Sequence, residues 1–183
     1  TAILFRRCLS ACVRPVACYN KRITAAVLKV VINNISSPVL LASVYMPVND
    51  ATEFSDSEFE DVCGSLNAII TDCNVSAFIL CGDFNYKFDS LRQKTIDLYM
   101  NEFSGISADK HYLDADSFTY VSDSHDTVSW IDHVIVNKAI LSRLTNFSIL
   151  YDIIVSDHRP FSFALEAIAS VVDEATNDDV IIL

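Results

Sequence analysis

The chain has 183 residues, of which 51% are hydrophobic, and its net charge is −11 at pH 7. This length suffices for one domain with a substantial core, and the composition excludes a disordered chain. The strong negative charge argues against a surface that binds polyanions over most of its area. No uninterrupted apolar run approaches the roughly 18 residues that a membrane-spanning helix needs, so the sequence predicts no membrane segment.

The charge is unevenly distributed along the chain. Residues 1–48 contain six Lys and Arg residues and no Asp or Glu, a net charge of +6, whereas the remainder carries 7 basic and 24 acidic residues. The basic N-terminal part can face the phosphates of a nucleic acid. The acidic remainder would repel them unless a divalent cation neutralises the charge at the point of contact. The six cysteines form no CxxC pair, which indicates a reduced, intracellular protein.

The first quarter of the chain is rich in strand signals. Residues 2–7 predict a short strand, and a loop holding Pro15 follows. Residues 23–32 are rich in Val, Ile and Leu, which is typical of a strongly buried strand. Turn-forming residues at 33–38 then separate this strand from another at 39–45. The two long strands are therefore expected to form an antiparallel pair that feeds a central sheet.

A helical period begins at residue 53. Apolar residues recur at intervals of three and four from Glu53 to Cys73, and Ser55 with Glu58 matches a capping box. This pattern predicts an amphipathic helix that lies on the sheet. An apolar run then predicts a buried strand that leads into the motif CGDFN at 81–85, and a further helix is predicted at 91–103.

The second half of the chain mixes loops with short strands. A helical turn is predicted at 140–144, and strands are predicted at 118–121, 128–136, 147–151 and 160–165. Helices inserted between mostly hydrophobic strands indicate a layered α/β or α+β fold. After Glu166 the sequence becomes acidic without a clear period, so residues 167–183 are predicted to be a tail or linker.

Polar residues interrupt or end four of these strands. They are Tyr45 in SVYMP, Asp83 and Asn85 in CGDFN, Asp132 in SWIDHVIV, and Asp157 and His158 in VSDHRPF. A buried carboxylate is costly unless it is paired or bound to a cation, so aspartates at strand positions need partners, which a shared site would supply. If the strand ends converge, this set of side chains suits metal-assisted hydrolysis of a phosphodiester.

Taken singly, each of these residues also has a simpler structural interpretation. A Gly-Asp pair after a core strand is usually a turn, Asp132 can be an exposed strand residue, and His158 can be an ordinary surface histidine. The remaining histidines lack a supporting pattern and are predicted to be structural; they are His111, His125 and His133.

In their order along the chain, the four motifs SVYMP, CGDFN, SWIDHVIV and VSDHRPF resemble the endonuclease/exonuclease/phosphatase superfamily. More specifically, they resemble the apurinic-endonuclease-like domains of non-LTR retrotransposons. The resemblance covers residues 1–166, which would form the domain. It implies an α/β (α+β) fold, a four-layer αββα sandwich with the active site at one end of its two packed sheets.

The resemblance also implies a role for each site residue. Asp83 would orient or deprotonate the attacking water, and Asn85 would contact the scissile phosphate. Asp157 would be a ligand of the catalytic Mg²⁺, for which Mn²⁺ is an alternative. His158 would hydrogen-bond a non-bridging phosphate oxygen, and Asp132 would orient that imidazole and favour its charged form.

Tyr45 matches the phenol that lies near the phosphate or the leaving oxygen in the family. The sequence departs from the family at its start, because the family has a metal-binding Glu and an Asn on earlier strands, whereas the first acidic residue here is Asp50. We therefore expect the N-terminal strands of the domain to be missing, together with one ligand of a Mg²⁺ site that few protein groups support.

The activity that the resemblance implies is Mg²⁺-dependent nicking of DNA by a non-LTR retrotransposon endonuclease, leaving a 3′ hydroxyl and a 5′ phosphate. Its partners would be DNA and, in the intact element, a downstream reverse transcriptase, with no membrane association and a nuclear location. One alternative is a phosphatase or phosphodiesterase of the same superfamily that acts on lipid or inositol phosphates. A second alternative, favoured by the missing Glu, is a catalytically inactive fragment that retains the fold.

Overall fold

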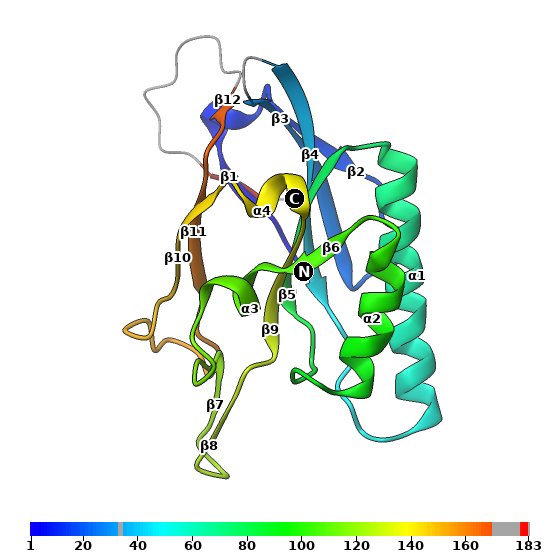
Figure 1. Ribbon diagram of the computed structural model, residues 1–183, viewed down its shortest axis with the longest axis vertical. Coiled ribbons are helices and arrows are strands. Elements are labelled where there is room, and N and C mark those ends of the chain that lie inside the picture. The colour runs from blue at the N-terminus through cyan, green and yellow to red at the C-terminus, as the bar shows by residue number, and fades with distance from the viewer. Residues whose placement is uncertain (33–34, 170–179, 183) are drawn as a thin grey trace.

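A seven-stranded sheet forms the centre of the computed structural model, which describes residues 1–32, 35–169 and 180–182 (Figure 1). The order across the sheet is β12-β3-β4-β5-β9-β6, and β2 also pairs with β3. The strands are β2 (Val13–Val16), β3 (Ile23–Ile32), β4 (Ile35–Tyr45), β5 (Ala77–Asp83), β6 (Gly105–Ser107), β9 (Asp132–Asn137) and β12 (Ile168–Ala169). β4 runs parallel to β5, whereas the pairs β3/β4 and β5/β9 are antiparallel.

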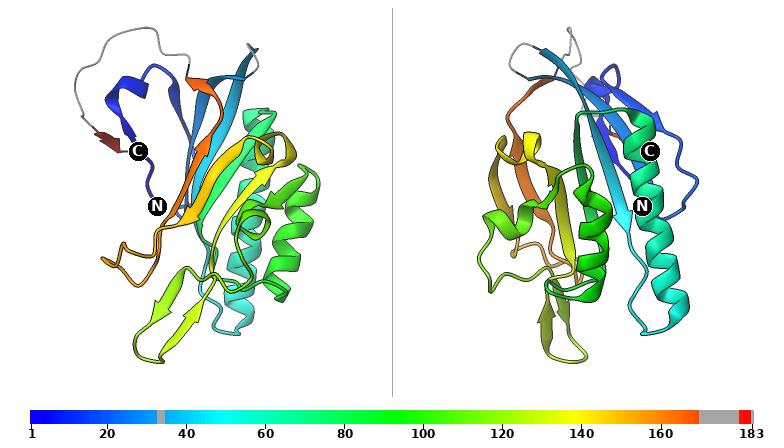
Figure 2. Two further views of the ribbon diagram at one scale, coloured as in Figure 1. Left: turned by 60° about the vertical axis from the view of Figure 1, so that its left-hand side comes forward. Right: turned by 45° about the vertical axis from the view of Figure 1, so that its right-hand side comes forward.

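Three strand pairs and four α-helices complete the described structure. The pairs are β1 (Leu4–Arg6) with β13 (Val180–Ile182), β7 (Tyr120–Ser122) with β8 (Thr127–Ser129), and β10 (Leu144–Ile149) with β11 (Phe161–Leu165). The helices are α1 (Glu53–Cys73), α2 (Leu91–Asn101), α3 (Ala108–Tyr112) and α4 (Lys138–Leu141), with a 3-10 turn at Arg7–Leu9. The β7/β8 hairpin projects from one end of the molecule (Figure 2).

The central sheet is buried on both faces because its strands alternate between two cores. In β4, Leu40 and Val44 pack in the cluster that α1 and α2 cover, whereas Val39 belongs to a second cluster on the opposite face. Phe161 and Phe163 of β11 close that second cluster, which α3 and α4 also join through Ala108 and Ile140. Figure 2 shows α1 and the β10/β11 pair on opposite sides of the sheet. The predicted α/β sandwich is confirmed.

Helix α1 has the predicted bounds but a different N-cap. The cap is Thr52, whose hydroxyl accepts a hydrogen bond from the backbone N–H of Ser55 at 3.2 Å. The capping box predicted to begin at Ser55 is therefore wrong, because the helix is capped one turn earlier, at Thr52. Ser55 is buried in the first turn of the helix. The helix ends at Asn74, which adopts the left-handed conformation (φ 47°) that favours Gly or Asn.

Several predicted loops and strands differ from the structure. The helical turn predicted at 140–144 lies at Lys138–Leu141, and the strand predicted at 147–151 lies at Leu144–Ile149. The turn expected at 33–38 is wrong from Ile35 onward, where β4 already begins, while residues 33–34 lie outside the described residues. Pro15 lies within β2, not in a loop; among the described residues β2 pairs only with β3, and Pro is tolerated on such an edge strand. The strand predicted at 128–136 is broken between β8 and β9, because the Thr119 hydroxyl accepts hydrogen bonds from the backbone N–H groups of Ile131 and Asp132.

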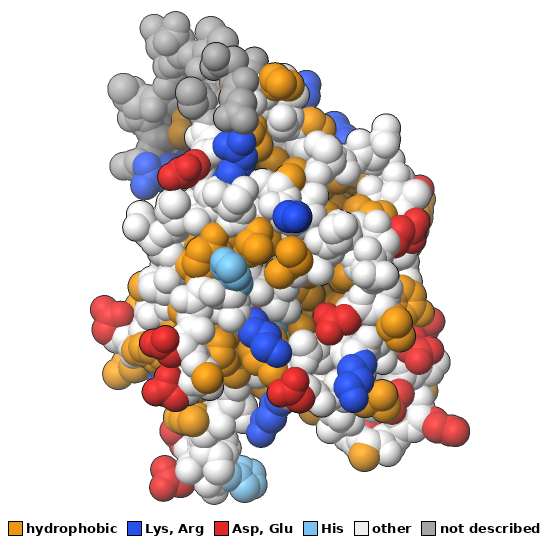
Figure 3. Space-filling model, in the orientation of Figure 1, with side chains coloured by type: hydrophobic (Ala, Val, Ile, Leu, Met, Phe, Trp, Pro, Cys, Tyr) orange, Lys and Arg blue, Asp and Glu red, His pale blue; other side chains and the backbone are white. Residues whose placement is uncertain are grey.

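Two short pieces of the predicted acidic tail pair with other strands. β12 pairs with β3, and β13 pairs with β1. The rest of that tail, residues 170–179 and 183, lies outside the described residues. None of the helices in the described part of the chain is long and apolar enough to cross a membrane. On the face drawn in Figure 3, acidic side chains surround the lower part, with Lys and Arg scattered between them.

Candidate active site

The register of three central strands places Tyr45, Asp83 and Asp132 in one row. Tyr45 at the end of β4 is the parallel partner of Asp83, and Asp83 at the end of β5 is the antiparallel partner of Asp132 at the start of β9. Neighbouring strands lie about 4.8 Å apart, so Asp83 lies between Tyr45 and Asp132 and close to both. Tyr45 is exposed, whereas Asp83 and Asp132 are partly buried. The strand ends therefore converge as the sequence motifs require.

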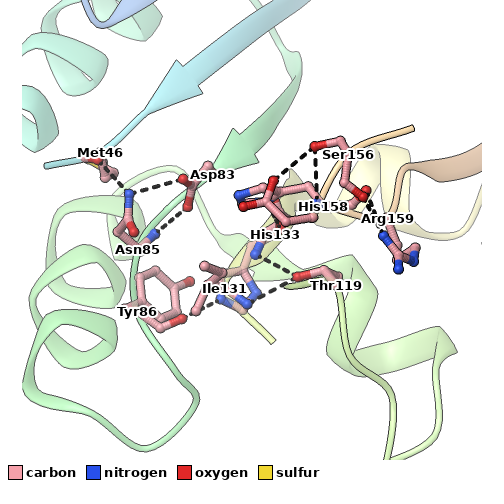
Figure 4. A network of polar contacts seen from close by, with 12 residues as sticks. Met46, Asp83, Asn85, Tyr86, Thr119, Ile131, His133, Ser156, His158 and Arg159 are labelled. Atoms are coloured by element: carbon pink, nitrogen blue, oxygen red, sulfur yellow. Dashed lines mark hydrogen bonds and ion pairs between the residues drawn. The ribbon is translucent and has the colours of Figure 1, made fainter. Parts of the chain in front are cut away.

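Asn85 holds the carboxylate of Asp83 in place immediately after β5. Its backbone N–H donates to Asp83 Oδ1 at 3.0 Å, and its side-chain Nδ2 donates to Asp83 Oδ2 at 3.0 Å and to the Met46 carbonyl at 2.9 Å (Figure 4). The backbone of Asn85 is left-handed (φ 51°), a conformation that Asn adopts more readily than most residues. In this arrangement the side-chain amide of Asn85, together with its backbone N–H, fixes the orientation of the Asp83 carboxylate.

His158 and Asp132 form a hydrogen-bonded pair across the site from Asn85. The Nδ1 atom of His158 lies 2.8 Å from Asp132 Oδ2 and 3.1 Å from Oδ1. This contact fixes the ring orientation and leaves Nε2 as the free nitrogen. Figure 4 shows Asp83 and Asn85 on one side of the site and His158 on the other.

The loop that carries His158 is hydrogen-bonded to Thr119 and to strand β7. The backbone N–H of Arg159 donates to the Thr119 carbonyl at 2.6 Å, and that of Val121 donates to the Asp157 carbonyl at 2.9 Å. Thr119 is fully buried and also binds the backbone of Asp132 through its hydroxyl, at 3.0 Å. One threonine thus ties Asp132 to the residue that follows His158, and the sequence motifs carried no signal of its role.

The charges of the site shift the pKa values of its titratable groups. Burial raises the pKa of the Asp83 carboxyl group, and the neighbouring charge of Asp132 raises it further. Burial likewise raises the pKa of Asp132. For His158, burial disfavours the charged ring, but its hydrogen bond to Asp132 and the surrounding carboxylates outweigh burial and raise its pKa. A carboxylate with enhanced basicity and a readily protonated imidazole therefore face the same space.

The Asp132–His158 pair predicts a pH dependence of stability. Because the pKa of His158 is raised in the folded state, its contribution is complete below about pH 6.5, the ordinary histidine value, and is lost as the pH rises through the folded pKa. At the acidic end, protonation of Asp132 through its own raised pKa removes the pair. We expect wild type to exceed His158→Gln in free energy of unfolding by on the order of 1 kcal/mol at about pH 6, measured in urea. An equal difference at about pH 9 would contradict this.

Asp157 is exposed in the loop between β10 and β11. Its Oδ1 accepts a hydrogen bond from the Ser156 hydroxyl at 3.0 Å. Among the described residues, no three His, Cys, Asp or Glu side chains are grouped as ligands for a metal ion. Mg²⁺ usually keeps several waters and takes only one or two protein carboxylates, so an exposed Asp157 fits a weakly held Mg²⁺ but not a closed protein cage.

A cavity of about 590 Å³ opens beside the Asp132–His158 pair. It lies between β5 and β11, with Phe161 and Phe163 on its apolar side. Asp132 and His158 line it as well, so a ligand that enters the cavity can reach both groups.

The other histidines lie apart from this group. His125 is exposed in the β7/β8 hairpin, where it contacts Ser122 and Ser124, and His111 is exposed on α3. His133 is fully buried beside Asp132 but faces the opposite side of β9.

Comparison with known proteins adds an independent finding. The model of a family described as endonuclease-reverse transcriptase matches residues 39–162 of this chain. No curated protein sequence matches the chain.

Three solved structures with the same fold are distant from this chain in sequence. The catalytic domain of Xenopus laevis APE2 has a TM-score of 0.66 at 13% identity, covering 84% of this chain and 58% of that domain. The endonuclease domain of TRAS1, a telomere-specific non-LTR retrotransposon, has a TM-score of 0.65 at 13% identity, covering 90% and 80%. The 3′ phosphatase NExo from Neisseria, bound to a product DNA hairpin, has a TM-score of 0.64 at 14% identity, covering 90% and 70%. The chain thus spans 58% of the APE2 domain, and these likenesses concern the fold.

The family match includes the three strand ends that carry Tyr45, Asp83 and Asp132, together with the loop of Asp157 and His158. Because this match covers well over half of the sequence, the chain belongs to the endonuclease-reverse transcriptase family, within the endonuclease/exonuclease/phosphatase superfamily.

Proposed function

We propose that this chain acts in the Mg²⁺-dependent nicking of DNA by a non-LTR retrotransposon, leaving a 3′ hydroxyl and a 5′ phosphate. The observation that carries the proposal is the convergence of Asp83 with the Asp132–His158 pair at the ends of β5 and β9. The family match and the likeness to the TRAS1 endonuclease domain support DNA as the substrate class.

Asp83 is the proposed general base. Its raised pKa makes its carboxylate a stronger proton acceptor than an exposed aspartate, and Asn85 holds both of its oxygens in a fixed direction. Asp83 accepts the proton of the attacking water, which then attacks phosphorus while the bond to the 3′ oxygen breaks. The leaving 3′ oxygen takes up a proton from solvent water and becomes a hydroxyl, and the oxygen of the attacking water remains on the 5′ phosphate.

The charged imidazole of His158 is the proposed donor to a non-bridging phosphate oxygen. Asp132 occupies Nδ1, which leaves Nε2–H on the far side of the ring from Asp132, and His158 lines the cavity. A fixed cationic donor is worth most where negative charge develops in the transition state. Tyr45, exposed at the end of β4, is the proposed phenol near the leaving oxygen.

Asp157 is the proposed ligand of Mg²⁺. When bound there, Mg²⁺ or Mn²⁺ would neutralise charge on the phosphoryl oxygens. In the intact element we propose that a linked reverse transcriptase extends from the 3′ hydroxyl, which implies action in the nucleus. Residues 1–166 would supply the nuclease part, and residues 167–183 would connect to the rest.

A non-catalytic role is the second candidate. The observation that favours it is the lack, among the described residues, of a ready group of three metal-ligating side chains. In that case the chain would keep the fold and bind a partner without cleaving it.

Conversion of supercoiled plasmid to nicked circle in Mg²⁺ separates the two candidates. We expect nicking by the wild type, its loss on addition of EDTA, and a fall of about 10²-fold or more in Asp157→Ala. Asp152→Ala is the matched control, because Asp152 is exposed in the same loop and should leave the rate unchanged. A folded wild type that does not nick, or nicking that survives EDTA, would contradict the proposed function.

A further inference from the structure

A second His–Asp pair lies directly behind the candidate active site. His133 and Asp109 are both 0% exposed, and Nδ1 of His133 lies 2.7 Å from Oδ2 of Asp109. His133 follows Asp132 in β9, so its ring points to the opposite face of the strand. No proposed catalytic step uses this pair, although burying two titratable groups is costly without a strong compensating interaction.

The second ring nitrogen of His133 reaches the backbone of the catalytic loop. Nε2 lies 3.0 Å from the carbonyl oxygen of Tyr86, the residue that follows Asn85 (Figure 4). A carbonyl oxygen can only accept, so Nε2 must carry the proton and donate it. One imidazole therefore joins the segment after β5 to the start of β9.

Asp109 anchors the other side of this ring. Its Oδ2 meets His133, while its Oδ1 accepts a hydrogen bond from the backbone N–H of Val134 at 3.2 Å. Asp109 lies in the first turn of α3, a helix that the sequence did not predict. Three segments that are distant in sequence thus meet at His133.

Aromatic rings enclose the junction. The ring of Tyr86 stacks on the imidazole at a centroid distance of 4.2 Å and an interplanar angle of 16°, and Phe88 contacts it edge-on at 4.7 Å. Water cannot replace the hydrogen bonds of a ring covered in this way, so each is stronger than it would be at the surface, and its loss leaves an unpaired buried group.

We propose that His133 is a positioning residue for the candidate site. By holding the Tyr86 carbonyl, it fixes the corner at Asn85, and Asn85 in turn directs the carboxylate of Asp83. The catalytic part of this inference rests on the proposed function, whereas the structural link from His133 to Asn85 does not. A displacement of about 1 Å in a catalytic group can reduce a rate by about 10²-fold, so the link to Tyr86 has a kinetic consequence.

Two substitutions of His133 each keep one of its two hydrogen bonds and remove the other. The side-chain nitrogen of Gln occupies roughly the position of Nε2, so His133→Gln keeps the donor to Tyr86 and loses the contact to Asp109. The nitrogen of Asn occupies roughly the position of Nδ1, so His133→Asn keeps Asp109 and loses Tyr86. We expect both variants to be less stable than wild type, and only His133→Asn to lose about 10- to 100-fold in single-turnover nicking rate at saturating DNA. Both are compared well below their unfolding temperatures.

Nuclear magnetic resonance tests the link without any activity. The Asn85 side-chain amide signals, assigned by their loss in Asn85→Asp, should keep their wild-type positions in His133→Gln and shift or broaden in His133→Asn. In the wild type, the His133 Nε2 proton should exchange slowly with water and show scalar coupling across its hydrogen bond to the Tyr86 carbonyl. A rapidly exchanging Nε2 proton in the wild type, or equal effects of the two variants on the Asn85 signals, would overturn the proposal. A wild type that does not nick but shows this Asn85 pattern would refute the nuclease function and support the positioning role.

Discussion

Asp83→Asn is expected to reduce the rate of plasmid nicking by about 10²- to 10⁴-fold, the usual contribution of a general base. The amide has the size and shape of the carboxylate but cannot take the proton of the attacking water. Because burial raises the pKa of Asp83, the folded state disfavours its ionised form, and removing that charge offsets the loss of the one Asn85 hydrogen bond that the new NH2 group cannot accept. We therefore expect the free energy of unfolding to change by only about 1 kcal/mol. The measurement is the single-turnover rate at saturating plasmid in Mg²⁺, with the unfolding midpoint in urea recorded for the same preparation.

The matched control for this variant is Asp61→Asn. Asp61 is exposed on α1, on the helix face turned away from the sheet, so the same chemical change there should leave both rate and stability unchanged. Nicking by Asp83→Asn at the wild-type rate would show that another group takes the proton. The role proposed for Asp83 would then be wrong.

Gly82→Ala is expected to be the most destabilising single methyl addition at the site. Gly82 has φ +146°, which L-residues rarely adopt, and a Cβ atom there would lie 2.0 Å from the carbonyl oxygen of Val44 in β4. Neither backbone can move away without breaking the parallel pairing of β4 and β5 that aligns Tyr45 with Asp83. We expect a loss of about 4 kcal/mol or more in free energy of unfolding, measured in urea.

Gly64→Ala provides the comparison for Gly82→Ala. Gly64 lies inside α1, and a Cβ atom there would meet nothing within 4 Å. Alanine favours a helix interior over glycine by about 0.5–1 kcal/mol, so this variant should be more stable than wild type. Equal unfolding midpoints for the two variants would mean that the close approach of β4 to Gly82 is not as described.

Hydrophobic periodicity was enough to predict the elements that depend on local sequence. The strand at Ile23–Ile32 and the helix at Glu53–Cys73 have the predicted bounds, because each has a long apolar pattern that only one kind of element can bury. The strand into Asp83 was equally clear, since it is buried on both faces. Asp83, the motif residue at the end of this last strand, was therefore placed correctly along the chain before any of its contacts was known.

The parts that were missed depend on contacts between distant segments. The break between β8 and β9 arises from the hydroxyl of Thr119, and nothing near Trp130 in the sequence marks it. The hydrogen bond between His133 and Asp109 joins residues 24 positions apart in the sequence. Asp109 lies in α3, a helix too short to show a hydrophobic period in the sequence. Local sequence can identify the ends of the strands, but not the buried polar groups that hold those ends together.

The most direct test of the central claim is the chemistry of the nick that the wild-type protein makes in water enriched in ¹⁸O. If Asp83 activates water for attack on phosphorus, each nick will carry a 3′ hydroxyl that a DNA polymerase extends without prior treatment, and its 5′ phosphate will contain one ¹⁸O atom. A 3′ phosphate end, a 5′ phosphate without the label, or no nicked circle from the folded protein in Mg²⁺ would contradict the account.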